Sequence, residues 1–139
     1  MIVDTSALIA ILKNEPEAQA FSEAIEAAKV VRVSAASYLE SRIVVGRYKD
    51  PILMARLEEI LENPGLQIEP VTAAQAKIAW EAYRDFGRGS GHPANLNFGD
   101  CFTYALAREK REPVLWKGDD FGHTDLRAAI HPLIAKVPR

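Results

Sequence analysis

Five acidic residues are candidates for chemistry, and four of them lie where elements of the chain are expected to begin or end. Asp4 follows a short apolar run, and Asp100 falls in the first turn of an expected helix. Glu40 lies in the helix after the second expected strand, and Asp119 and Asp120 lie in the turn after the last one. If these carboxylates converge, their repulsion would raise their pKa values and destabilise the fold unless a divalent cation neutralised them. Oxygen ligands suit Mg²⁺ or Mn²⁺, and the chain has no Cys/His cluster for zinc.

Taken singly, each acid also fits an ordinary structural role. An Asp at a strand end or in the first turn of a helix, such as Asp4 or Asp100, commonly caps the helix or interacts with its dipole. Asp119 and Asp120 both fit turn chemistry. The functional interpretation therefore depends on whether the acids come together.

Glu40 has a surprising position on its expected helix. At helical spacing its neighbours on the same face are apolar, namely Ala36, Ile43 and Val44. A charge on an apolar stripe costs free energy unless a partner compensates it. Glu40 is therefore a candidate functional residue, with a structural role left open because the helix phase depends on where the helix begins.

An alternation of strands and helices must position these acids. The pattern predicts strands at residues 2–3, 30–33, 66–71 and 113–116. It predicts helices up to residue 12 and at residues 16–29, 35–48, 51–62, 73–86 and 98–110, with a glycine-rich loop at residues 87–97. Short, nearly continuous apolar strands between helices are typical of an α/β fold with a parallel sheet covered on both faces. Ligands bind such sheets beyond the carboxyl ends of the strands, where the acids are expected.

Length and composition limit the remaining possibilities. A chain of 139 residues with 48% apolar residues fits one domain, residues 1–139. The net charge of −2 is not that of a strongly basic nucleic-acid binder, so any attraction to RNA must be local. The single cysteine, Cys101, cannot form an internal disulfide, which suits a reducing compartment. We expect a cytoplasmic protein with no secretory leader and no membrane span.

Four short motifs occur in the order and spacing of a known family. They are I-V-D-T-S-A (2–7), S-A-A-S-Y-L-E (34–40), N-L-N-F-G-D-C-F-T-Y-A-L-A (95–107) and L-W-K-G-D-D-F (115–121). Along almost its whole length the sequence resembles the PIN-domain family, and within it the VapC-type toxins of toxin–antitoxin pairs. The resemblance implies a three-layer α/β/α fold with a mainly parallel sheet, endoribonuclease activity, and an acidic site for Mg²⁺ or Mn²⁺.

The resemblance also implies roles for particular residues. The family's first three acids correspond to Asp4, Glu40 and Asp100, and its fourth to Asp120 or, as the alternate, Asp119. Asp4 and Asp100 would chiefly hold the metal, which would generate a nucleophile for phosphodiester hydrolysis. Glu40 and the fourth acid would orient water or complete a second metal site.

Further residues are expected to support these acids. Hydrogen bonds to a carboxylate or to metal-bound water are expected from Thr5, Ser6 and Asn97. Contacts with RNA phosphates are a hypothesis for Arg42, Arg88 and Lys117.

The resemblance implies two protein partners, a small VapB-like antitoxin that occupies the acidic groove and a second copy of the chain in a homodimer. One alternative is a catalytically inactive PIN-like module that only binds RNA. A receiver-type phosphoacceptor domain fits poorly, because Asp4 is followed by Thr5 and Ser6 rather than by another acid. A haloacid-dehalogenase-like phosphatase would need an Asp where Ser6 stands. The RNA target and the number of metal ions are left open.

Overall fold

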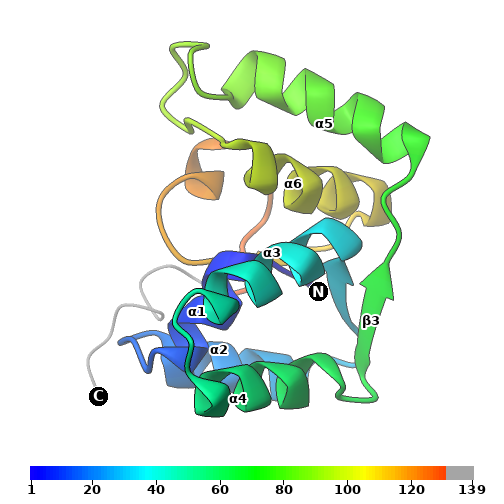
Figure 1. Cartoon of the computed structure of the whole chain (residues 1–139). Coiled ribbons are helices and arrows are strands. Elements are labelled where there is room, and N and C mark those ends of the chain that lie inside the picture. Colours follow the sequence, from blue (N-terminus) through cyan, green and yellow to red (C-terminus); the bar gives the residue numbers. More distant parts are fainter. Residues whose placement is uncertain (131–139) are drawn as a thin grey trace.

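The structure is a computed structural model that describes residues 1–130 of the chain (Figure 1). The strands of this part are β1 (Ile2–Val3), β2 (Val31–Ser34), β3 (Leu66–Glu69) and β4 (Val114–Leu115). The helices are α1 (Thr5–Leu12), α2 (Ala18–Ala27), α3 (Ala35–Gly46), α4 (Pro51–Leu61), α5 (Ala73–Phe86) and α6 (Phe98–Lys110). A short 3₁₀ helix, η1 (Phe121–His123), follows β4.

The strands form one parallel sheet in the order β3-β2-β1-β4. Ile2 of β1 pairs with Arg32 of β2 on one side and with Val114 of β4 on the other. Because all the strands run in the same direction, the chain leaves β1, β2 and β4 at the same edge of the sheet. The expected parallel sheet is therefore confirmed, and the predicted acids at strand ends belong to this one edge.

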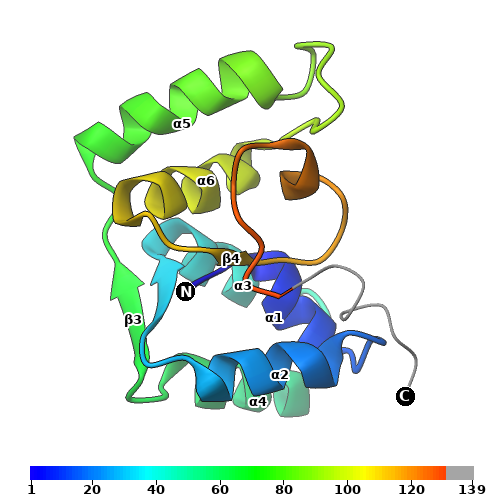
Figure 2. The same ribbon diagram turned by 180° about the vertical axis from the view of Figure 1, so that it is seen from behind.

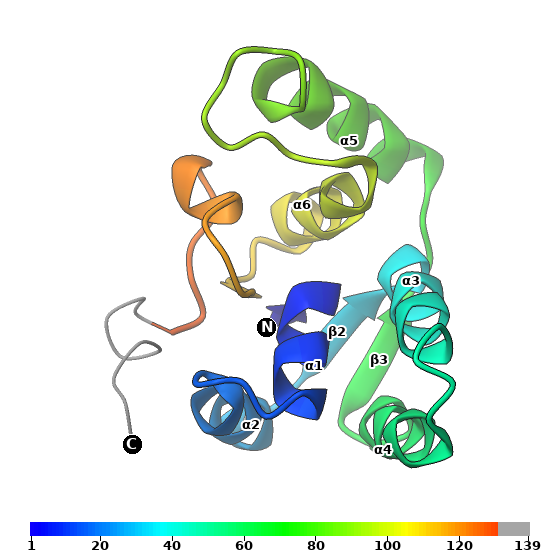
Figure 3. The same ribbon diagram turned by 60° about the vertical axis from the view of Figure 1, so that its left-hand side comes forward.

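Helices cover both faces of the sheet, as expected for three layers. Figure 1 shows α5 and α6 on one side of the sheet and α2 and α4 on the other, and the view from behind in Figure 2 agrees. The two residues of β1 pack on opposite faces of the sheet. Ile2 lies in a cluster with Leu106 of α6. Val3 lies in the cluster that contains Phe21 and Leu57. α5 packs along α6, outside the sheet (Figure 3).

Capping residues define several helix starts as the sequence predicts. The hydroxyl of Ser34 accepts a hydrogen bond from the N–H of Ala36, and Thr72 accepts one from the N–H of Gln75. Such caps satisfy N–H groups that have no partner inside the helix. They explain why the starts of α3 and α5 could be predicted to the residue.

Other boundaries differ from the expectation. α2 begins at Ala18 after Glu17, so Pro16 precedes the helix instead of occupying its first position. β2 is shifted by one residue, β3 ends at Glu69, and β4 has only two residues. Apolar patterning defines such short strands poorly, because backbone pairing with the neighbours sets their ends. Within residues 1–130, no helix is long and apolar enough to cross a membrane.

Candidate active site

Asp4 is a buried carboxylate at the carboxyl end of β1. Its side chain is 5% exposed, and it caps the start of α1. Its Oδ2 accepts a hydrogen bond from the N–H of Ser6 at 3.0 Å, and its Oδ1 accepts one from the hydroxyl of Thr103 at 2.6 Å. Hydrogen bonds to a charged group offset part of the cost of its burial. Asp4 thus serves as a helix cap and also faces α6.

Asp100 lies in the first turn of α6 and takes part in a capping box. Its Oδ2 accepts a hydrogen bond from the N–H of Asn97 at 3.0 Å, and its own N–H donates to Oδ1 of Asn97 at 2.8 Å. Burial, followed by the charges of Asp4 and Asp120, raises the pKa of Asp100 to about 7, although the Asn97 hydrogen bond opposes the shift. Three carboxylates from separate parts of the chain are therefore close enough to interact.

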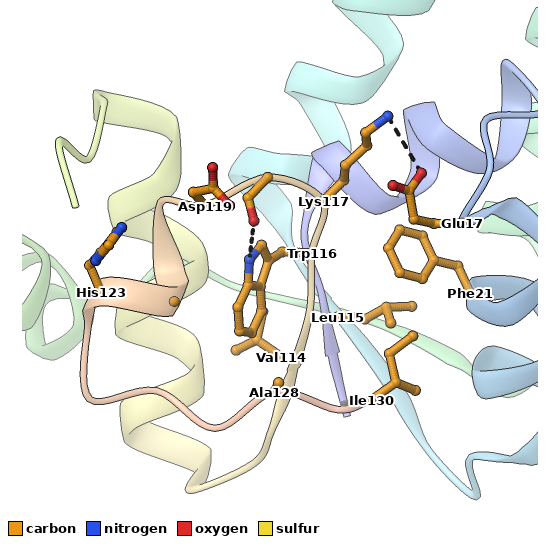
Figure 4. Close-up of a pocket in the computed structure, with 12 residues that line it drawn as sticks. Glu17, Phe21, Val114, Leu115, Trp116, Lys117, Asp119, His123, Ala128 and Ile130 are labelled. Atoms are coloured by element: carbon orange, nitrogen blue, oxygen red, sulfur yellow. Dashed lines mark hydrogen bonds and ion pairs between the residues drawn. The ribbon is translucent and has the colours of Figure 1, made fainter. Parts of the chain in front are cut away.

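The two acids after β4 lie differently. Asp120 is partly buried, and its side chain is close enough to Asp100 to raise the pKa of that carboxyl through both charge and hydrogen bonding. Asp119 is exposed and lines a hollow of about 270 Å³ that Trp116 and Lys117 also line (Figure 4). Of the two candidates for the fourth acid, Asp120 is the one that lies beside the other carboxylates.

Glu40 reaches the same region from α3. Its carboxyl group packs against the backbone of Gly99, where an added Cβ would lie 3.1 Å from the Glu40 Cδ and closer still to Oε2. This contact places Glu40 beside the first turn of α6, next to Asp100. A side chain on residue 99 would occupy the space that Glu40 uses.

Glu40 was singled out because it was expected to lie on an apolar stripe of its helix, and that expectation was wrong. The buried residues of α3 are Ser37, Ser41 and Val45, whereas Ile43 is 47% exposed. The buried face is therefore rotated from the one assumed, and Glu40 lies at its edge rather than on a buried apolar stripe. The contact with Gly99 is what distinguishes this residue.

The hydroxyl groups of Thr5 and Ser6 do not contact the carboxylates. Thr5 donates a hydrogen bond to the backbone oxygen of Ser37 at 3.3 Å, and the Ser6 hydroxyl accepts one from the backbone N–H of Lys117 at 3.0 Å. The Ser6 contribution to Asp4 comes from its backbone. These side chains therefore tie α1 to α3 and to the segment after β4, which fixes the elements that carry the acids.

Thr103 and Ser37 were not identified from the sequence. Both are buried, and their hydroxyl oxygens lie 3.3 Å apart, so Ser37 extends the hydrogen-bond chain from Asp4 through Thr103. A buried hydroxyl needs a polar partner. Thr103 lies one helical turn after Asp100 within an otherwise mostly apolar segment, and this was the available signal.

Two of the three expected phosphate-binding cations are paired with acids. Arg42 forms an ion pair with Glu58 at 3.0 Å, and Lys117 forms one with Glu15. Lys117 also pairs with Glu17 (Figure 4). These contacts reduce the charge available to a phosphate. Arg88 is exposed in the glycine-rich loop.

A comparison with protein families decides the identity of this fold. The family model described as PIN domain matches residues 1–126. The chain belongs to the PIN domain family. It is 57% identical to Ribonuclease VapC28 of Mycobacterium tuberculosis over 94% of this chain and 98% of that protein. It is 49% identical to Ribonuclease VapC42 of the same organism over 93% and 98% of the two chains.

Solved structures share the fold of this PIN domain. The crystal structure of Mycobacterium tuberculosis VapC20, described as a Sarcin-Ricin loop cleaving toxin, has a TM-score of 0.75 and 20% identity, covering 94% of this chain and 98% of that one. FitAcB from Neisseria gonorrhoeae has a TM-score of 0.64 and 21% identity over 91% and 94% of the chains. The family membership decides against a receiver-type or haloacid-dehalogenase-like protein.

The acids of this PIN domain fit a lightly coordinated divalent cation. Within residues 1–130, no group of three His, Cys, Asp or Glu side chains is arranged to hold a metal ion by itself. Mg²⁺ commonly binds one or two carboxylates, with water and substrate phosphate completing its shell. Asp4 and Asp100 can supply that minimal set. Burial and the charges of Asp4 and Asp120 raise the pKa of Asp100, so a cation bound there would offset this repulsion.

Proposed function

We propose that this PIN domain is a divalent-metal-dependent endoribonuclease and the toxin of a toxin–antitoxin pair. The names of its relatives, Ribonuclease VapC28 and Ribonuclease VapC42, support RNA cleavage. The observation that carries the proposal is the placement of Asp4 at the end of β1 and Asp100 at the start of α6, with Glu40 packed against Gly99 and Asp120 close to Asp100. Carboxylates that are fixed close together despite their mutual repulsion, at the carboxyl edge of a parallel sheet, are more typical of a site for a cation and a phosphodiester than of a purely structural role.

Each acid has a role that follows from its surroundings. Asp4 and Asp100 would hold Mg²⁺ or Mn²⁺, which when bound supplies charge neutralisation and activation of water for attack on phosphorus. Thr103 and the Ser6 N–H fix the orientation of Asp4, and Asn97 fixes that of Asp100. These contacts hold the acids before the substrate arrives, which limits the reorganisation needed for reaction.

Glu40 and Asp120 complete the proposed site. Glu40 approaches the first turn of α6 from α3, and Asp120 approaches Asp100 from the turn after β4. We assign them to orienting the attacking water or to a second cation. In-line attack by water on phosphorus with cleavage of the bond to the 3′-oxygen would leave a 5′-phosphate and a 3′-hydroxyl. No 2′,3′-cyclic phosphate would form, because the ribose 2′-hydroxyl does not attack.

The first test is cleavage of a mixed cellular RNA pool by purified protein in Mg²⁺, Mn²⁺ or EDTA. Asp4→Asn and Asp100→Asn should each lower the rate about a hundredfold or more, since each removes a charge from the metal site. Asp119→Asn is the matched control: it removes the same charge from the neighbouring, exposed position and should cleave like the unmodified protein, whereas Asp120→Asn should not.

The cut ends test the chemistry separately from the residues. Products that carry 2′,3′-cyclic phosphate would contradict attack by water. Equal losses in Asp119→Asn and Asp120→Asn would contradict the assignment of the fourth acid. RNA binding without cleavage in any metal would favour a catalytically inactive RNA-binding module.

Partners and location form a further part of the proposal. The structure described as a toxin-antitoxin complex from Klebsiella pneumoniae shares the fold, with a TM-score of 0.65 at 17% identity. We propose a VapB-like antitoxin as inhibitor, a homodimer, and action in the cytoplasm, where RNA substrates occur. Co-expression with a neighbouring short reading frame should give a complex that does not cleave RNA, and light scattering of the free protein should give twice the chain mass.

Contacts with RNA phosphates remain a hypothesis for Arg42, Arg88 and Lys117. Arg88 fits the role best, because it is exposed and lies in the glycine-rich loop. Arg42 and Lys117 would first have to exchange their carboxylate partners for phosphate. Arg88→Ala should therefore reduce the salt dependence of RNA binding more than Arg42→Ala does.

A further inference from the structure

An exposed aromatic side chain lies beside the acidic site. Phe98 is the first residue of α6, two positions before Asp100, and it is 77% exposed. The residue between them, Gly99, is the one against which Glu40 packs. Phe98 therefore adjoins the acids through both the chain and the Glu40 contact, although it takes no part in the chemistry described above.

Phe102 supports the ring of Phe98 without covering it. The two rings meet edge to face, with centroids 4.9 Å apart and planes at 87°. Such a contact covers at most one face of the Phe98 ring, so at least one face is left for another partner. Phe102 lies one turn further along α6 and is partly buried, which anchors the pair on the helix. The result is a flat apolar surface held at the start of α6.

The substrate needs a source of affinity other than charge. The chain carries a net charge of −2, and the acids repel the phosphates that must approach them. Arg42 and Lys117 already pair with carboxylates. Stacking of bases on aromatic side chains supplies affinity that does not depend on charge, and it requires bases that are not stacked in a duplex.

We propose that Phe98 is a positioning residue that stacks an unpaired base next to the scissile phosphate. The inference rests on the proposed acidic site, because Phe98 gains this role from its place beside Asp100. The contact requires a base at the cleavage point that can leave its neighbours, as in single-stranded or looped RNA. Phe98 holds that base while the phosphate beside it lies at the acids.

The test uses the full chain and a short single-stranded RNA that the unmodified protein cuts at a mapped position. Phe98→Ala should raise KM about tenfold to a hundredfold, with a smaller effect on kcat. Phe98→Leu, which keeps an apolar side chain without a flat ring, should resemble Phe98→Ala, and Phe98→Trp should restore the low KM. Trp80→Ala is the control, because Trp80 is 62% exposed on α5 and that helix carries none of the acids of the proposed site.

Removing the base from the RNA tests the same contact from the other side. An abasic nucleotide at one position beside the cut should raise KM for the unmodified protein as much as Phe98→Ala does, and should add nothing to the effect of Phe98→Ala. Fluorescence of 2-aminopurine placed there should fall when Asp100→Asn protein binds the RNA in EDTA, and should not fall when Phe98 is also replaced by Ala. This second readout requires no cleavage.

The possible failures are distinguishable. If no RNA is cut by the unmodified protein in any metal, but 2-aminopurine in a bound single-stranded RNA still loses fluorescence only when Phe98 is present, the proposed function is contradicted and the stacking contact is supported. An unchanged KM for Phe98→Ala, or effects of Phe98→Ala and the abasic nucleotide that simply add, would overturn the stacking proposal. So would weaker association of Phe98→Ala with a second copy or with an antitoxin at an unchanged KM, since Phe98 would then be a protein contact.

Discussion

Replacing Asp100 should make the metal-free protein more stable at alkaline pH. Its pKa is raised from 3.8 to about 7, so the unfolded chain loses this proton first as the pH rises. Between pH 3.8 and about 7 the folded state therefore binds more protons than the unfolded chain, and the free energy of unfolding falls as the pH rises through this range. At about 1.4 kcal/mol per pKa unit the full loss above pH 7 is about 4 kcal/mol. This value is an upper bound, because Asp100 is only partly buried and solvent screens its interactions with Asp4 and Asp120.

Urea unfolding at about pH 5 and about pH 8.5, in EDTA and in Mg²⁺, measures this effect. The unmodified protein in EDTA should lose stability at the higher pH, and Mg²⁺ should restore it. Asp100→Asn keeps an oxygen that can accept the Asn97 hydrogen bond, so it should lose much less stability and should respond little to Mg²⁺. The reasoning is refuted if Asp100→Asn loses as much stability as the unmodified protein, because other groups would then cause the pH dependence.

Two further substitutions test the surroundings of the acids. Thr103→Val removes the hydroxyl that bonds Asp4 at 2.6 Å and should lower cleavage about tenfold to a hundredfold in steady-state assays; an unchanged rate would mean that this bond does not position Asp4. Gly99→Ala should displace the Glu40 carboxyl group while favouring the helix, so cleavage should fall about tenfold or more with no loss of thermal stability. Full activity of Gly99→Ala would show that the position of Glu40 does not matter.

The order and type of the elements could be predicted because local signals define them. Ser34, Thr72 and the Asp50-Pro51 pair mark helix starts by hydrogen bonds within a few residues of the chain. Strand ends could not be predicted as well, since β4 has only two residues and is defined by its pairing with β1. The position of Asp4 followed from the end of β1, which made it the most predictable of the acids.

The contacts around the acids depend on tertiary structure, so they could not be predicted from the pattern of apolar and polar residues in the sequence. Thr103 meets Asp4 across 99 positions of the chain. Glu40 meets Gly99 across 59 positions. The choice between Asp119 and Asp120 depends on which way each side chain points in one turn, because sequence neighbours in a turn can face opposite surroundings. The pairing of Lys117 with Glu15 was likewise not predicted.

Asp4 and Asp100 differ in how far their hydrogen bonds offset the cost of placing a charge in the site. Asp4 is the more buried of the two, yet it accepts hydrogen bonds from both a hydroxyl and a backbone N–H. Asp100 accepts one from Asn97 and faces the charges of both Asp4 and Asp120. The first turn of a helix favours a carboxylate, but the raised pKa of Asp100 shows that burial and like charges outweigh this effect. A divalent cation beside Asp100 would relieve the repulsion from Asp4 and Asp120, while Asp4 would supply a ligand already held in place by its hydrogen bonds.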